Sequence, residues 1–137
     1  MNATSTLEQV AIRDVMHAGL IHCVPSTPMS KVAAIMAAHR IHSVVVARDD
    51  DTSPGWGVVS DLDVAAALVT RPLAEQSAAG SAATPGILIS ETESVLRAAQ
   101  LMTKYGVSHL IAVAEGTDRP VGVISTLDVA DAAASST

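Results

Sequence analysis

Hydrophobic positions in the first half of the chain fall into short continuous runs and into longer stretches with helical spacing. Val32, Ile35, Met36 and His39 lie three or four residues apart on one predicted helical face, which is typical of a helix packed on a core. Five elements are predicted in the order β-α-β-β-α: a strand at 20–24, a helix begun by Ser26-Thr27-Pro28, strands at 43–47 and 57–59, and a helix from Leu62-Asp63. Ser and Thr satisfy free amides at a helix start, and proline there removes no hydrogen bond.

The second half of the chain predicts the same order of elements. They are a strand at 87–89, a helix begun by Thr92-Glu93, strands at 109–113 and 121–124, and a helix from Leu127-Asp128. Ala98, Leu101, Met102 and Tyr105 share one helical face. Gly106 is expected to end this helix, because glycine adopts the left-handed conformation that commonly follows a last turn.

The two halves are copies of one another. A shift of 65 positions places residues 57–67 on residues 122–132 with eight of eleven positions identical. Upstream, a shift of 66 places Ile21 on Ile87 and Met36 on Met102, so one residue is inserted between 47 and 56. A match of this length at a fixed period indicates an internal repeat.

This repeat divides the chain into an N-terminal helix and lead-in at 1–17, a first repeat at 18–69, a linker at 70–84 and a second repeat at 85–134. Ser5-Thr6-Leu7-Glu8 fits a capping box and predicts a short helix through Met16. The linker is rich in Ala, Ser and Gly. Neither repeat is large enough to bury a sufficient core alone, so the two are expected to pack on each other in an α/β fold.

Composition narrows the classes of protein. Of 137 residues, 49% are apolar and 16% charged, which excludes a disordered chain. No apolar run reaches the roughly 18–20 residues of a membrane-spanning helix, so membrane insertion is not expected. With no Phe, one Trp and one Tyr, the core is expected to form by close approach of alanine-faced helices to Val/Ile strands.

Charge and cysteine content point away from nucleic acid and from oxidising compartments. The net charge is −6 and only eight Lys or Arg are present, too few and too scattered to neutralise a phosphate backbone. Cys23 has no partner for a disulfide, and no basic-then-apolar signal segment opens the chain. We therefore expect a reduced, cytoplasmic protein.

A Ser-x-x-Asp motif stands at the same place in both repeats, where a strand turns into a helix. The copies are Ser60–Asp63 and Ser125–Asp128. Amides and the positive dipole end of a helix start favour an anionic group, and a carboxylate is a suitable acceptor for a vicinal diol. The alternative is that both residues only cap the helix.

Other chemistry has weaker support in the sequence. His39 and His42 lack a third metal ligand, and Asp49-Asp50-Asp51 lacks the glycine and glutamate of a calcium loop, so it is expected to be a solvated hairpin loop. No metal site is therefore predicted. Cys23 is expected to be a small buried apolar residue. No nucleophile elbow or phosphate-loop lysine motif is present, so no catalytic residue is assigned and the protein is not expected to be an enzyme.

The motifs resemble the CBS domain pair, or Bateman module, over roughly residues 12–134. Gly57-Val58-Val59-Ser60-Asp61-Leu62-Asp63 and Gly122-Val123-Ile124-Ser125-Thr126-Leu127-Asp128 are similar to the family's signature. Ile12-Arg13-Asp14-Val15-Met16 resembles its lead-in, whereas no clear lead-in precedes the second repeat. The resemblance implies tandem β-α-β-β-α repeats packed with pseudo-twofold symmetry.

The resemblance also implies a ligand that contains adenosine, such as AMP, ADP, ATP, S-adenosylmethionine or NAD, bound in clefts between the repeats. Ribose would meet Asp63 and Asp128, and phosphate would meet Ser60, Ser125 and Thr126. His42 is similar in position to a phosphate-contacting histidine, and His109 follows the matching Ser108; an ordinary strand histidine is the alternative for both. Adenine would pack on aliphatic strand residues, for which the candidates are Ile21, Val44, Ile87 and Leu110.

The two motifs are not expected to bind phosphate equally. Asp61 follows Ser60 and places a second carboxylate where phosphate would approach, whereas Thr126 follows Ser125 and offers a hydroxyl donor. We therefore predict that the Ser125–Asp128 motif is the better phosphate site.

The function implied by the resemblance is regulatory. The module would sense an adenine nucleotide or related compound, require no cofactor, associate as a homodimer and signal through dimer geometry to an unidentified effector protein. The alternative is a dimerisation or adaptor module that acts without a ligand.

Overall fold

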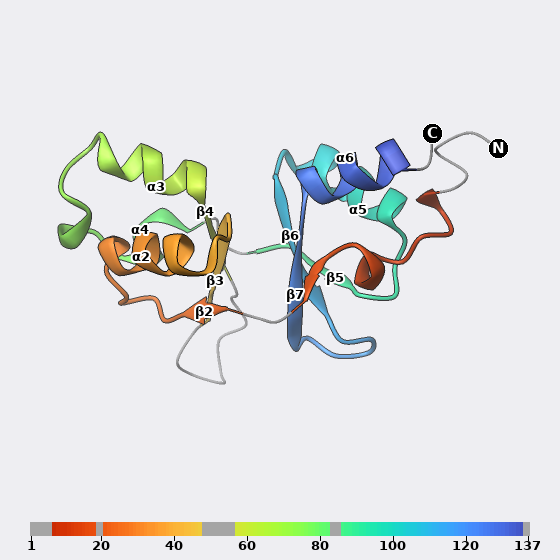
Figure 1. The fold of residues 1–137 in the computed structure, drawn as a ribbon. Helices are drawn as coiled ribbons and strands as arrows, with labels where there is room; N and C mark the ends of the chain where they lie inside the picture. Colours follow the sequence, from red (N-terminus) through yellow and green to blue (C-terminus); the bar gives the residue numbers. More distant parts are fainter. Residues whose placement is uncertain (1–6, 19–20, 48–56, 83–85, 136–137) are drawn as a thin grey trace. The chain divides into compact units, whose positions relative to one another are not determined.

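The computed structural model describes residues 7–18, 21–47, 57–82 and 86–135. The chain divides into two compact units (Figure 1). The first-repeat unit comprises Ile21–Gly86, and the second-repeat unit comprises Met1–Leu20 together with Ile87–Thr137. The N-terminal segment thus belongs with the second repeat, and the segment between the repeats belongs with the first.

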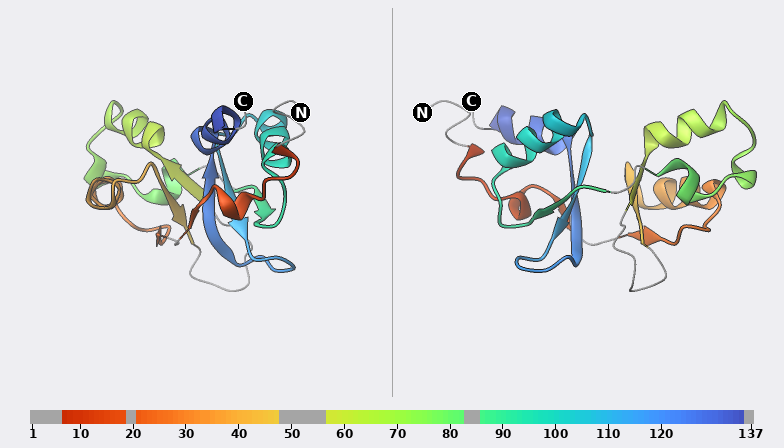
Figure 2. Two further views of the ribbon diagram at one scale, coloured as in Figure 1. Left: turned by 45° about the vertical axis from the view of Figure 1, so that its right-hand side comes forward. Right: turned by 180° about the vertical axis from the view of Figure 1, so that it is seen from behind.

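The first-repeat unit has the predicted β-α-β-β-α order. Its elements are β2 (His22–Cys23), α2 (Met29–His39), β3 (Ser43–Val46), β4 (Gly57–Ser60) and α3 (Asp61–Leu68), followed by η2 (Leu73–Glu75) and α4 (Ala78–Ser81). The described strands form a sheet in the order β2-β3-β4, with β2 parallel and β4 antiparallel to β3. Helices α2 and α3 cover one face of this sheet (Figures 1 and 2).

The second-repeat unit has the same order with an added strand. Its elements are η1 (Ile12–Asp14), β1 (His17–Ala18), β5 (Leu88–Ser90), α5 (Val95–Tyr105), β6 (His109–Val113), β7 (Pro120–Ser125) and α6 (Thr126–Ser135). Strand order is β1-β7-β6-β5, and β1 runs antiparallel to β7. The tandem α/β repeat predicted from the sequence is confirmed.

Each unit buries one face of its sheet against its helices. In the first, Val44, Val46 and Val59 pack with Met29, Val32 and Met36. In the second, Leu110, Ala112 and Ile124 pack with Ala98 and Met102. Alternate strand residues point to opposite faces, so these valines, leucines and alanines belong to the helix-facing side. Close packing without large aromatic side chains follows, as the composition predicts.

Helix ends depart slightly from the sequence predictions. Pro28 is the residue before α2 and not its first residue, and α5 begins after Ser94, two residues beyond Thr92. The Ser94 side chain accepts a hydrogen bond from the Arg97 amide and so caps the helix, which explains why α5 starts later than predicted. Gly106 ends α5 with φ of 64°, as predicted. The matching Arg40 adopts φ of 52° without being glycine.

The predicted N-terminal helix does not continue to Met16, because Leu7 is helical but the residues after it form turns. Ala11 forms a bridge with Ser94, and a short 3₁₀ turn at Ile12–Asp14 leads into β1. The amides of Ile12 and Arg13 donate to the carbonyls of Glu93 and Glu91, so tertiary contacts replace the helical pattern. Ser5 and Thr6 of the capping box, and the hairpin loop at 49–55, lie outside the described residues.

A lead-in segment also lies between the repeats, where the sequence shows no clear one. The Met29 amide donates to Gln76 O at 2.8 Å, as the Val95 amide donates to Val10 O at 2.9 Å. The Ala78 amide donates a hydrogen bond to Thr27 O at 2.8 Å. The Ile12 amide makes the equivalent bond to Glu93 O, also at 2.8 Å. Both Ala78 and Ile12 are fully buried. Each lead-in therefore packs on the repeat that it does not directly precede.

Candidate functional site

The first Ser-x-x-Asp motif forms a capping box at the start of α3. Ser60 N and Ser60 Oγ donate to Asp63 Oδ2 at 2.8 and 2.9 Å, and Asp63 N donates back to Ser60 Oγ at 3.3 Å. Two free helix-start groups are satisfied reciprocally. The carboxylate thus uses one oxygen for the cap, and Oδ1 is the oxygen that can meet another group.

The second motif repeats this geometry at the start of α6. Ser125 N and Oγ donate to Asp128 Oδ2 at 2.8 and 3.0 Å, and Asp128 N donates to Ser125 Oγ at 3.2 Å. The capping role proposed as the alternative is therefore real for both copies. It leaves one oxygen of each carboxylate for a ligand, so capping and binding are compatible.

The two aspartates differ in exposure and neighbours. Asp63 is half-buried, whereas Asp128 is only 6% exposed. His17 of β1 places Nδ1 at 3.4 Å from Asp128 Oδ1. His17 is not among the site residues predicted from the sequence. The sequence places His17 directly after Met16 of the lead-in. Its contact with Asp128 could not be predicted, because it depends on the pairing of His17 with Val123 between β1 and β7.

The position after each serine also differs between the units. Asp61 is exposed and bonds His42 Nδ1 through Oδ2 at 3.0 Å, while its Oδ1 accepts the Leu62 amide at 2.9 Å. An exposed pair of this kind contributes little to stability, about 0–1 kcal/mol. At the matching place in the second unit Thr126 is exposed. Asp61 thus occupies the Leu62 amide, one of the backbone donors at the start of α3.

His42 and His109 do not occupy matching positions. Asp61 N donates to His42 O and Thr126 N donates to Ser108 O, each at 2.9 Å, which makes Ser108 the counterpart of His42. The His109 ring lies 2.9 Å from Ser108 Oγ. The structure therefore brings His42 to the first motif through Asp61, and it places His109 one residue further along its strand.

The aliphatic candidates need correction. Val44 and Leu110 have no exposed area and pack in the helix-facing cores of their units, so neither side chain can contact adenine in this conformation. Side chains alternate between the two faces of a strand, but the sequence did not show which of these faces the helices cover. Ile21 and Ile87 are half-buried, and Ile87 packs beside the second core.

The lone cysteine is buried, as predicted. Cys23 packs in the core of the first unit. Burial raises the pKa of its thiol, and a hydrogen bond with Thr27 opposes this shift. Among the described residues, no group of three or more His, Cys, Asp or Glu side chains could hold a metal ion. In the same part of the chain, no helix is both long and apolar enough to cross a membrane.

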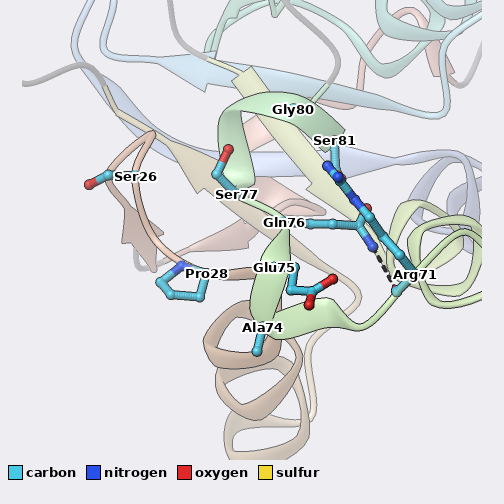
Figure 3. Close-up of a pocket in the computed structure, with 9 residues that line it drawn as sticks. All are labelled: Ser26, Pro28, Arg71, Ala74, Glu75, Gln76, Ser77, Gly80 and Ser81. Atoms are coloured by element: carbon cyan, nitrogen blue, oxygen red, sulfur yellow. Dashed lines mark hydrogen bonds between the residues drawn. The ribbon is translucent and has the colours of Figure 1, made fainter.

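A separate pocket of about 330 Å³ lies in the first-repeat unit (Figure 3). Its lining is mostly polar and comes from the start of α2 and the segment between the repeats: Ser26, Pro28, Arg71, Ala74, Glu75, Gln76, Ser77, Gly80 and Ser81. Gln76 Nε2 donates to Arg71 O at 2.8 Å and fixes one wall. The lining contains neither Ser60 nor Asp63.

Comparison with known proteins identifies the family. The CBS domain model matches residues 12–70 and 80–135, and the chain belongs to the CBS domain family. No curated protein sequence matches it.

Solved structures share the fold at low sequence identity. The CBS domain pair of protein MJ0100, in complex with 5′-methylthioadenosine and S-adenosyl-L-methionine, has a TM-score of 0.76 and 20% identity, over 93% of this chain and 98% of that chain. The Pyrobaculum aerophilum CBS domain protein PAE2072, complexed with AMP, has a TM-score of 0.74 and 22% identity, over 87% of this chain and 89% of that chain. The CBS domain of a bacterial CNNM/CorC family Mg²⁺ transporter in complex with ATP has a TM-score of 0.76 and 18% identity, over 96% of this chain and 92% of that chain.

Proposed function

We propose that this chain is a regulatory module that binds an adenosine-containing ligand of the AMP, ADP, ATP, S-adenosylmethionine or NAD class at its Ser-x-x-Asp motifs. The observation that carries the proposal is the pair of capping boxes, each of which commits one carboxylate oxygen and leaves Oδ1. Three structural neighbours that bind adenosine compounds support the choice of ligand class.

In this proposal Asp63 and Asp128 accept hydrogen bonds from ribose hydroxyls through Oδ1. The hydroxyls of Ser60 and Ser125 already donate to Oδ2, so they must rotate if they are to donate to phosphate. Helix-start amides and the dipole of each helix attract the anionic part of the ligand. Ile21 and Ile87, which are half-buried, are the remaining aliphatic candidates for contact with adenine.

The second motif is proposed as the better phosphate site. At the first motif the Asp61 carboxylate accepts the Leu62 amide, so it both covers a donor and adds negative charge. The exposed Thr126 at the second motif brings a neutral hydroxyl instead. The pairing of Asp61 with His42 offsets part of this charge.

A homodimer is proposed from an exposed apolar stripe. On α3 and its C-cap, Val69, the residues with i, i+3, i+4, i+7 spacing are all exposed: Leu62, Ala65, Ala66 and Val69. Leu62 is 74% and Val69 86% exposed, which is unusual for large apolar side chains on one helix face. Leu127, Ala130, Asp131 and Ala134 repeat the spacing on α6. A second copy that covers these faces would let ligand binding alter dimer geometry and inform an effector protein.

The proposed role is regulatory and not catalytic, and it requires no cofactor. A cytoplasmic location is proposed with it, because there Cys23 would remain a reduced thiol.

A thermal-shift panel tests the proposal. AMP, ADP, ATP, S-adenosylmethionine and NAD are added separately at high excess, and one of them should raise the unfolding midpoint by several degrees. Asp63→Ala and Asp128→Ala should remove the shift. Ser94→Ala is the matched control, because Ser94 caps α5 outside both motifs, so it should lower the midpoint but keep the shift. A flat panel with an intact dimer would favour the adaptor function.

A further inference from the structure

Asp128 is a nearly buried carboxylate whose two oxygens both have neighbours. Oδ2 accepts two hydrogen bonds from Ser125 within the cap. Oδ1 lies 3.4 Å from the imidazole Nδ1 of His17. Asp128 is 6% exposed and His17 is 70% exposed, so a nearly buried carboxylate has a mostly exposed histidine beside its Oδ1.

His17 is held in this place by the docking of β1. Its backbone pairs with Val123, and Ala18 pairs with Gly122. A β-carbon at position 122 would stand 2.6 Å from His17 O and 2.9 Å from Met16 Sδ, so only glycine lets the strand approach this closely. The position of His17 beside Asp128 is therefore built into the sheet.

The first motif has no comparable arrangement. Within the part of the chain that the structure describes, no ion pair to Asp63 is found. The shift of 66 that relates the two lead-ins places Ala83 opposite His17 in the sequence, and alanine has no group that could bind a carboxylate. In the described residues, the second motif is thus the one that combines a nearly buried aspartate with a histidine beside its Oδ1.

We propose that His17 competes with the ligand's ribose for Asp128 Oδ1 and so lowers the affinity of the second motif for compounds with a free vicinal diol. This inference rests on the proposed function. A ribose hydroxyl must donate to Oδ1, the oxygen that His17 faces, because Oδ2 is committed to the cap. The 3.4 Å separation is longer than a good hydrogen bond, and the exposed ring can turn towards solvent when a diol arrives.

The competition gives the two motifs different ligand responses. At the first motif the diol meets an aspartate with no histidine at Oδ1 among the described residues, so a ligand that has the diol but no phosphate should fill that motif at lower concentration. At the second motif binding must first displace His17. The phosphate preference of the second motif is a separate effect and should become visible once His17 is removed.

The test measures AMP binding by calorimetry in an Asp63→Asn background, in which only the second motif reports. His17→Ala should raise the affinity for AMP roughly three- to tenfold, the effect of removing one hydrogen-bonded competitor. The gain should vanish for 2′,3′-dideoxy-AMP, which lacks the diol. His22→Ala, at an exposed histidine on β2, should change neither affinity. His17→Ser is a second variant at this exposed position and should give the same gain in AMP affinity as His17→Ala. Thermal unfolding checks that both His17 variants fold.

The outcomes separate this inference from the proposed function. Lower AMP affinity in His17→Ala would make His17 a ligand contact and overturn the competition. Unchanged AMP affinity, or an equal gain for the dideoxy compound, would also overturn it while leaving the proposed function intact. Absence of AMP binding in every variant, together with a flat panel for the other adenosine compounds, would overturn both.

Discussion

Gly122 on β7 lies directly against His17 on β1: a β-carbon at position 122 would stand 2.6 Å from the His17 carbonyl oxygen. This contact joins the N-terminal lead-in to the second-repeat sheet, which is otherwise built from residues more than sixty positions later in the chain. It also determines where the His17 side chain lies relative to Asp128. The close approach of two backbones therefore connects the fold to the proposed site.

Gly122→Ala is expected to destabilise the protein by about 1–3 kcal/mol, because the added carbon overpacks against backbone that cannot move aside easily. Urea unfolding measures the change. Gly80→Ala is the control: its β-carbon would meet only Ser77 Oγ at 3.8 Å, an ordinary contact. Equal stability of the Gly122 variant and the wild type would show that β1 does not dock as described.

The strands and helices were largely predictable because the apolar periodicity and the caps agree with one another. Strand β6 at His109–Val113 matches its prediction residue for residue. Two features could not be predicted in this way. The exchange of lead-ins rests on a few tertiary backbone bonds, such as that from Met29 N to Gln76 O, and these leave no periodic signal. The burial of Val44 depends on which sheet face the helices cover.

Exchange of the residue after each serine should exchange the phosphate preferences. In an Asp128→Asn background, Asp61→Thr is expected to raise the ratio of AMP affinity to adenosine affinity at the first motif roughly two- to fivefold, because a like charge is removed and the Leu62 amide is freed. Titration calorimetry with both compounds gives the ratio. Thr126→Asp, measured in the Asp63→Asn background, should lower it. A ratio that stays constant in both variants would mean that phosphate binds elsewhere.

The proposed dimer should depend on the α3 stripe. Leu62→Asp combined with Val69→Asp places charge on the most exposed apolar positions and is expected to give monomers, as measured by sedimentation equilibrium. Tyr105→Ser changes an exposed apolar residue on α5 and should leave association unchanged. A dimer that persists in the Asp variant would exclude this face as the interface.

Cys23 should react slowly with thiol reagents in the folded protein. Burial limits access, and the raised pKa of the thiol lowers the thiolate fraction at a given pH. Iodoacetamide labelling, followed by mass spectrometry, should accelerate sharply in urea.

The same shift predicts how stability depends on alkaline pH. A thiol whose pKa is raised by folding stabilises the protein below the unfolded-state pKa, and this contribution is lost as pH rises through the folded-state pKa. Cys23→Ala should therefore weaken the fall in stability that begins near the unfolded-state thiol pKa of about 8.5. Labelling of the native protein as fast as in urea would contradict the burial of this residue.

The most direct test of the account is a calorimetric titration of the wild type and of the Asp63→Asn/Asp128→Asn double variant with the compound that gives the largest thermal shift. The account predicts saturable binding to the wild type and none to a double variant that remains folded. Binding of equal affinity to the double variant would contradict the central claim that the Oδ1 oxygens of these two carboxylates hold the ligand.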